Sequence, residues 1–259
     1  MILAIDVGNT NIVFGGIENN KTAFVTRLNT DKNKTEDEYA VIFKTLMEIY
    51  GFTVSDFTGG IISSVVPQLN EILKKAVKKL IDHEPLIVSP GIKTGLNIQI
   101  DNPATLGSDI VVGCVAACAA YPKPLIVIDM GTATTIVVVD KNSVYRGGVI
   151  IPGVMVSMES LTKNAAQLQS ISLDAPSKTI GTNTADCMRS GIVFGNAAMV
   201  DGIIDRMSDE IEGTPTIIAT GGLAQKIIPH CHHKIIIDDE LLIKGLEIIY
   251  NKNKGDNHG

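Results

Sequence analysis

The sequence predicts an α/β protein of two similar lobes, each with a mixed sheet flanked by helices. One observation is a repeat: LAIDVGNTNIVFGG at residues 3–16 nearly recurs as LIVIDMGTATTIVVVD at residues 125–140. In each copy an apolar strand ends in Asp-x-Gly, small hydroxyl or amide residues follow, and a second apolar strand comes next. Asp6 and Asp129 therefore occupy equivalent places. The other observation is that strand and helix patterns alternate along all 259 residues.

Composition agrees with a globular protein and excludes some partners. Apolar residues make up 45% of the chain and charged residues 19%, which is ordinary for a packed domain. The net charge of −6 and the lack of a Lys/Arg run argue against nucleic-acid binding. We find no signal peptide and no apolar run long enough for a membrane span, so we expect a soluble cytoplasmic protein. The four cysteines lack disulfide or zinc spacing, and Cys114 and Cys118 are expected to be buried thiols.

The first half is predicted to begin with three strands within residues 1–30, joined by tight turns. Helices and further strands are expected to follow. These elements are a helix within 34–52, a strand at 59–67 closed by Pro67, a helix at 68–81, a strand at 84–90, a loop from Gly91 to Pro103 and a helix starting near Leu106.

The second half is predicted to repeat the opening with three more strands. The expected elements are strands at 124–131, 134–141 and 144–153, a helix from Val154 to Gln167, one long helix or two within 183–211, a strand at 214–222, a closing helix at 239–253 and a frayed tail from Lys254. We divide the chain into lobes at 1–115 and 116–259, with the closing helix, at about 239–252, free to pack on the first lobe.

The repeated turn has the chemistry of a phosphate site. A glycine there lets backbone N–H groups approach an anion, and Thr or Asn side chains add donors. The carboxylate before it repels phosphate but can hold a cation that phosphates also bind. Hairpin turns often contain Asp and Gly, so one copy would mean little. Two copies favour a shared function, with each turn gripping the phosphates of one nucleotide from its own side of a cleft. Neither copy is a Walker loop or a dinucleotide fingerprint.

Seven motifs, taken together and in order, give the chain a resemblance to a known family. They are DVGNTN at 6–11, SSVVP at 63–67, NPATLGSD at 102–109, DMGTATT at 129–135, GGVIIPG at 147–153, NTADCMRSGI at 183–192 and LLIKGLEIIY at 241–250. The chain resembles the type III pantothenate kinases of the actin and sugar-kinase superfamily. The resemblance implies duplicated ribonuclease-H-like (actin-like ATPase) lobes. It also implies ATP-dependent phosphorylation of pantothenate to 4′-phosphopantothenate, the first step of coenzyme A biosynthesis, by a homodimer.

The resemblance also implies roles for single residues. Asp109 corresponds to the general base, Asp6 lies near Mg²⁺, and Asp129 binds a monovalent cation, K⁺ or NH₄⁺. The implied ATP contacts are Asp6, Val7, Gly8, Asn9, Thr10, Asn11, Ile12, Val13 and Thr132, with Gly221 and Gly222 near the adenosine. The implied pantothenate contacts are Gly107, Ser108, Asp109, Ile110 and Thr184.

Two positions depart from the family pattern. Ile110 stands where relatives usually have Arg after the Asp, and Ile100 stands where many have Tyr. Losing a charge-assisted contact of Arg costs on the order of 1.5–3 kcal/mol. Two alternatives therefore stay open: a kinase with a different small hydroxyl acceptor, and a nucleotide-sensing regulator without turnover. Retention of Asp109 and Thr184 argues against the regulator.

Several residues also have plain structural interpretations. Asp109 could serve as a helix cap or first-turn charge. The cluster HCHH at 230–233 suggests a metal site, but adjacent residues do not readily converge on one ion, and we favour a loop. Arg27 and Thr30 could face the cleft or a subunit partner, or simply finish a strand. Arg189 could reach the site or a dimer interface, or lie on an exposed helix face.

Overall fold

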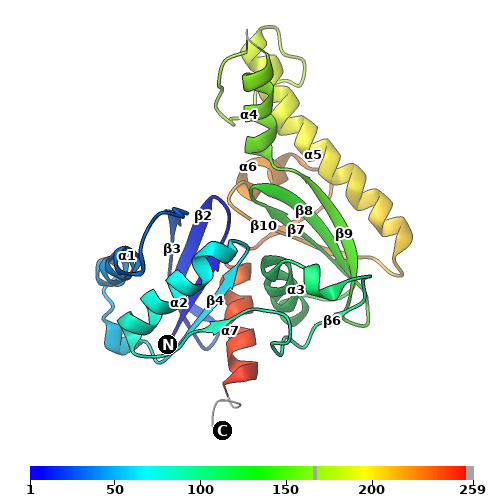
Figure 1. Ribbon diagram of the computed structural model, residues 1–259. Helices are drawn as coiled ribbons and strands as arrows, with labels where there is room; N and C mark the ends of the chain where they lie inside the picture. The colour runs from blue at the N-terminus through cyan, green and yellow to red at the C-terminus, as the bar shows by residue number, and fades with distance from the viewer. Residues whose placement is uncertain (166–167, 255–259) are drawn as a thin grey trace. The chain divides into compact units, whose positions relative to one another are not determined.

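The computed structural model describes residues 1–165 and 168–254 and separates into two compact units (Figure 1). The first unit comprises Met1–Leu96, Asn102–Ala119 and Glu240–Gly259. The second comprises Asn97–Asp101 and Ala120–Asp239. Compactness does not by itself define a folding domain, so the boundary predicted between residues 115 and 116 stays a prediction. Among the described residues, no helix is both long and apolar enough to cross a membrane.

The first unit contains a five-stranded sheet in the order β3-β2-β1-β4-β5. Its strands are β1 (Ile2–Val7), β2 (Asn11–Glu18), β3 (Lys21–Asn29), β4 (Gly60–Ser64) and β5 (Leu86–Ile87). The predicted three-strand opening is confirmed: β1, β2 and β3 pair antiparallel, and β4 lies parallel to β1. The run at 84–90 yields only the two residues of β5, because Pro85 and Pro90 cannot donate to a strand ladder.

Helices complete the first unit. They are α1 (Glu36–Ile49), α2 (Pro67–Ile81), α3 (Ser108–Ala120) and α7 (Leu241–Asn253), with short 3₁₀ turns at Val54–Asp56 and Pro103–Thr105. Pro67 does not close a strand as predicted; β4 ends at Ser64, and Pro67 is the first residue of α2, where its missing N–H costs nothing. The 3₁₀ turn delays α3, which was expected from Leu106, to Ser108.

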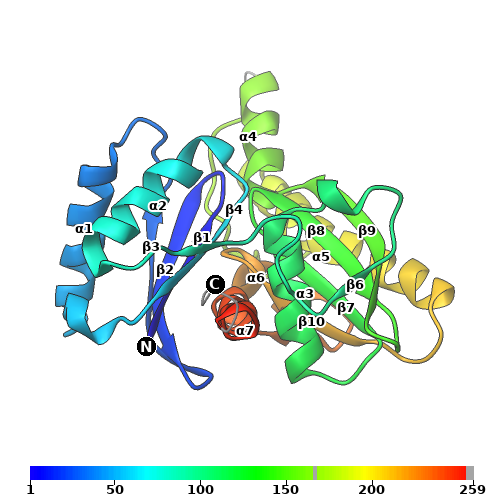
Figure 2. The same cartoon turned by 60° about the horizontal axis from the view of Figure 1, so that its bottom comes forward.

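The core of the first unit lies between its sheet and the helices α1 and α2. The rings of Phe14 on β2 and Phe43 on α1 stack at a centroid distance of 4.5 Å, and both are fully buried. In Figure 2, α1 and α2 lie on one side of this sheet and α7 on the other. Gly245 lets α7 approach α3 closely, since a Cβ there would lie only 2.2 Å from the carbonyl oxygen of Val112. The helix α7 is therefore part of the first unit.

The second unit contains a six-stranded sheet in the order β11-β10-β7-β8-β9-β6. Its strands are β6 (Asn97–Ile98), β7 (Leu125–Met130), β8 (Ala133–Val139), β9 (Val144–Pro152), β10 (Thr216–Thr220) and β11 (Ile236–Ile237). The antiparallel β7, β8 and β9 repeat the opening of the first unit, as predicted. The segment from Gly91 to Pro103 was predicted to be a loop. That prediction is wrong at β6, which pairs with Val144 and Tyr145 far along the chain.

The helices of the second unit are α4 (Val154–Asn164), α5 (Thr184–Glu210) and α6 (Ala224–Ile227), with a 3₁₀ turn at Ile228–His230. The segment predicted as one long helix or two is the single helix α5. The helix predicted from Val154 to Gln167 is α4, which ends at Asn164. Residues 166–167 lie outside the described residues. Most of the predicted tail, residues 255–259, also lies outside them.

Candidate active site

The first Asp-x-Gly turn joins β1 to β2 and is held by backbone and side-chain hydrogen bonds. Asp6, near the end of β1, is only 7% exposed. The N–H of Gly8 donates to the carbonyl of Asn11 at 2.9 Å and closes the turn. Thr30, which follows β3, donates its hydroxyl to the Gly8 carbonyl at 2.7 Å and its N–H to the Thr10 carbonyl at 2.9 Å. The turn thus has a fixed backbone beside a buried carboxylate.

Asp109 lies in the first turn of α3, and its side chain is partly buried. Its Oδ1 accepts the N–H of Ile110 at 2.8 Å. Burial raises the pKa of Asp109 above its usual 3.8, and hydrogen bonds from its own and the Ile110 N–H oppose the shift. A Cβ on Gly107 would lie 2.5 Å from the same oxygen, so glycine leaves room for this carboxylate. The result is a carboxylate with raised proton affinity and a defined position.

Two serines connect Asp109 to the strand beside Asp6. Ser63 on β4 is fully buried and stands opposite Asp6 in the parallel β1–β4 register. Its hydroxyl donates to the Ser108 hydroxyl at 3.0 Å. The Ser108 hydroxyl also accepts the Ser64 N–H and donates to the Ser64 carbonyl, both at 3.1 Å. The beginning of α3 is therefore anchored to the end of β4, and Asp6 and Asp109 are connected within the first unit.

The second Asp-x-Gly turn joins β7 to β8 in the second unit. The Gly131 N–H donates to the Ala133 carbonyl at 3.0 Å. Gly221, at the end of β10, has a φ of +97°, and a Cβ there would lie 2.5 Å from Asp129 Oδ1 and 2.6 Å from the Met130 nitrogen. Glycine thus lets the backbone after β10 pass close to the Asp129 carboxylate and the Met130 backbone.

The remaining predicted residues of the second unit lie on its turns and helix ends. Thr132 is exposed, and its carbonyl accepts the Gly153 N–H at 3.2 Å. Thr184 is the exposed first residue of α5. The preceding Asn183 caps the helix, because its Oδ1 accepts the Asp186 N–H at 2.9 Å. The helix end carrying Thr184 is therefore well ordered locally.

The two implied cations fit the carboxylates present. Mg²⁺ usually takes one or two carboxylates and completes its shell with water and substrate phosphates, which suits Asp6 beside the first turn. The Asp129 carboxylate supplies the anionic oxygen ligand that a monovalent cation would need.

The cluster at 230–233 has a structural role. The backbone N–H groups of His232 and His233 donate to the buried carboxylate of Asp201 at 2.8 and 3.2 Å. The His233 ring contacts Asp205 at 2.8 Å. Burial raises the pKa of the Cys231 thiol to about 12. Within residues 1–165 and 168–254, no group of three or more His, Cys, Asp or Glu side chains could hold a metal.

The two arginines singled out in the sequence make local contacts. Arg189 on α5 pairs with Asp186 at 3.3 Å, and Arg27 lies exposed on β3 opposite Val13. A groove of about 640 Å³ in the second unit lies at the β8–β9 turn, the opposite end of β8 from Asp129. Its lining includes none of the predicted site residues.

Sequence reasoning missed the Ser63–Ser108 contact, although SSVVP at 63–67 was recognised as a motif. The only signal was the presence of two serines at the end of an apolar strand. It gave no indication of which of their hydroxyls would face α3.

The family model described as type III pantothenate kinase matches residues 2–206. A type III pantothenate kinase of Bacillus cytotoxicus is 44% identical over 253 residues, which cover 98% of this chain and 97% of the relative. That of Halalkalibacterium halodurans is 46% identical over 253 residues, covering 98% of this chain and all of the relative.

Solved structures share the fold at low sequence identity. A Campylobacter jejuni protein described as a Baf family transcriptional activator has a TM-score of 0.59 and 22% identity, with 97% of this chain and 98% of that chain covered. Component A of Acidaminococcus fermentans (R)-2-hydroxyglutaryl-CoA dehydratase has a TM-score of 0.56 and 14% identity, with 98% of each chain covered. These likenesses concern the fold alone and agree with the predicted α/β class, mixed sheets flanked by helices. With the family model and both curated relatives in agreement, the chain belongs to the type III pantothenate kinase family.

Proposed function

We propose that Asp109 is the general base of this kinase and accepts the proton of the attacking pantothenate hydroxyl. The protein phosphorylates pantothenate with ATP to give 4′-phosphopantothenate, the first step of coenzyme A biosynthesis. The observation that supports Asp109 is its geometry: a partly buried carboxylate at the start of α3, anchored through Ser108 and Ser63 to the strand next to Asp6. This connection suits a base that must keep a constant position relative to the first Asp-x-Gly turn.

The raised pKa suits the chemistry. A primary hydroxyl is a poor nucleophile, and a carboxylate within hydrogen-bond reach can take its proton as the bond to phosphorus forms. A base with raised proton affinity does this better than an exposed aspartate. Phosphoryl transfer otherwise depends on positioning and on neutralising phosphate charge. We assign positioning to the two turns.

The ATP contacts proposed are the first turn, Asp6 to Val13, and Thr132 of the second turn. Gly221 and Gly222 are proposed near the adenosine. Asp6 would hold Mg²⁺, directly or through water, and Asp129 a potassium or ammonium ion. When bound, these cations neutralise charge on the phosphates.

For pantothenate we propose contacts from Gly107, Ser108, Ile110 and Thr184. Because the Ser108 hydroxyl is engaged with Ser64, we assign its backbone rather than its hydroxyl to the substrate. Ile110 supplies no charged group, so a partner subunit's side chain could take the place of the usual arginine. A homodimer acting in the cytoplasm, without nucleic acid or membrane, completes the proposal.

The test is formation of 4′-phosphopantothenate by the purified protein with ATP and Mg²⁺, with and without potassium, followed by mass spectrometry. We expect turnover that potassium stimulates. A panel of other small hydroxyl compounds, assayed in parallel, addresses the altered acceptor residues. Tight ATP binding without turnover on any acceptor would contradict the proposal and favour a nucleotide-sensing protein.

A further inference from the structure

One threonine holds two carbonyl oxygens of the first Asp-x-Gly turn. The Thr30 hydroxyl binds the carbonyl of Gly8 at 2.7 Å, and the Thr30 N–H binds the carbonyl of Thr10 at 2.9 Å. The carbonyl of Asn11 accepts the Gly8 N–H at 2.9 Å. Three carbonyl oxygens of this short turn are therefore engaged by protein donors, two of them by a single residue.

The direction of these carbonyls matters for an anion. A peptide carbonyl carries partial negative charge and repels phosphate oxygens, whereas backbone N–H groups attract them. In a glycine-containing turn the peptide planes rotate easily, so the direction of each carbonyl needs an external partner. Thr30 supplies that partner for the peptide group at Gly8, the residue with the greatest freedom.

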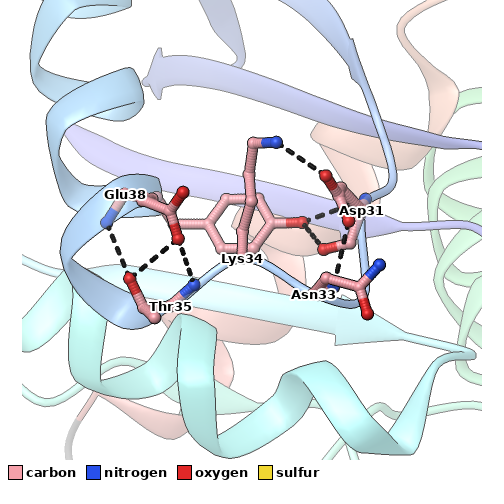
Figure 3. A network of polar contacts seen from close by, with 6 residues as sticks. Asp31, Asn33, Lys34, Thr35 and Glu38 are labelled. Atoms are coloured by element: carbon pink, nitrogen blue, oxygen red, sulfur yellow. Dashed lines mark hydrogen bonds and ion pairs between the residues drawn. The ribbon is translucent and has the colours of Figure 1, made fainter.

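The segment that carries Thr30 is itself locked to α1 (Figure 3). Tyr39 is fully buried, and its hydroxyl donates to the Asp31 carbonyl at 2.7 Å and accepts the Asp31 N–H at 3.2 Å. The Asp31 carboxylate accepts the Asn33 N–H at 3.0 Å and the Lys34 ammonium at 2.7 Å. The residue after Thr30 thus has its N–H, carbonyl and carboxylate all bound.

The start of α1 completes this local framework. Thr35 and Glu38 form a capping box: the Thr35 N–H donates to Glu38 Oε2 at 2.8 Å, and the Thr35 hydroxyl accepts the Glu38 N–H at 3.4 Å. Figure 3 shows the box and the Asp31 contacts on the two sides of one short loop. Thr30 therefore lies at the end of a hydrogen-bonded connection between β3 and α1.

We infer that Thr30 is a positioning residue for ATP binding: its hydroxyl keeps the Gly8 carbonyl turned away from the phosphates. This inference rests on the proposed role of the first turn in binding ATP. Thr30 itself touches no reacting atom and acts only through the turn.

The experiment compares three side chains at position 30. Thr30→Val keeps the shape and the backbone N–H but removes the hydroxyl donor. We expect the Kd for ATP, measured by calorimetry, to rise about threefold to tenfold, the effect of one lost hydrogen bond. The KM for pantothenate at saturating ATP should not change. Thr30→Ser, which restores the hydroxyl, should return the Kd to near the value of the unaltered protein.

Thr45→Val is the matched control. It also removes a threonine hydroxyl from a carbonyl, that of Val41 at 2.9 Å, but on the exposed side of α1. It should bind ATP normally. Tyr39→Phe keeps the Thr30 side chain but removes the hydroxyl that holds Asp31, the next residue. It should therefore weaken ATP binding as well, and it serves as the test if Thr30→Val does not fold.

An unchanged ATP Kd in Thr30→Val, or a loss of equal size in Thr45→Val, would overturn the inference. If Thr30→Val does not fold, an unchanged Kd in Tyr39→Phe would overturn it. Failure of the unaltered protein to bind ATP would instead contradict the proposed function, and this inference with it.

Discussion

At the scale of single residues, Asp109 combines a helix-start position with partial burial, which raises the pKa of its carboxyl. The sequence alone left it balanced between a helix-cap role and a base. The equivalence of Asp6 and Asp129 was predictable, because the repeat aligns them. The contacts of Thr30 with Gly8 and of Ser63 with Ser108 were not, because they join residues 22 and 45 positions apart. Such contacts depend on how strands and helices meet, which local patterns do not encode.

Burial of Asp109 predicts a shifted pH dependence. A general base works only when ionised, and the pKa of Asp109 is raised above 3.8 by desolvation. Activity should therefore be constant at neutral pH and fall as the pH drops through this raised pKa, above 3.8. The measurement is kcat/KM for pantothenate between about pH 3 and pH 8, with circular dichroism confirming the fold at each pH. An acid limb at or below 3.8 would contradict the assignment.

At the scale of elements, the antiparallel openings β1–β3 and β7–β9 followed from alternating apolar residues and turn signals. Short elements were less predictable. β6 has two residues and exists only because Val144 and Tyr145 offer it a partner. The beginning of α2 was misjudged because Pro67 fits both the end of a strand and the first turn of a helix.

The end of β10 offers a test of the second turn. Gly221→Ala would place a Cβ 2.6 Å from the Met130 nitrogen at a φ of +97°. We expect it to lower the free energy of unfolding by about 2 kcal/mol or more, from left-handed strain and overpacking. The control is Gly191→Ala, exposed inside α5 with nothing within 4 Å of the new Cβ. It should raise stability by about 0.5–1 kcal/mol. Urea unfolding measures both, and equal effects would refute the packing argument.

At the scale of the whole molecule, the chain builds two compact units from a repeated plan, but it does not complete them in order. The first unit needs the last helix, α7, which packs on β1, β2 and β4. The sequence analysis allowed the closing helix to pack on the first lobe but did not require it. The repeat predicted two lobes. It did not predict that Asn97–Asp101 belongs to the second unit, because that depends on the pairing of β6 with β9.

Because the first unit depends on α7, a substitution at the centre of α7 should strongly lower the free energy of unfolding. Leu246 is fully buried, so Leu246→Ala should lower the free energy of unfolding by about 2–5 kcal/mol through lost burial and a cavity. Val41→Ala, at a side chain 65% exposed, should change it by less than about 0.5 kcal/mol. Urea unfolding of the full chain distinguishes them. Similar small changes in the free energy of unfolding for both variants would contradict this prediction and mean that α7 contributes little to the stability of the first unit.

The most direct test of the central claim is the turnover of Asp109→Asn with pantothenate and ATP. The variant keeps the size of the side chain and removes the base. If Asp109 accepts the hydroxyl proton, kcat should fall by about 10²- to 10⁴-fold while the Kd for ATP stays the same. A variant that binds ATP normally and retains a kcat near that of the unaltered protein would contradict the account.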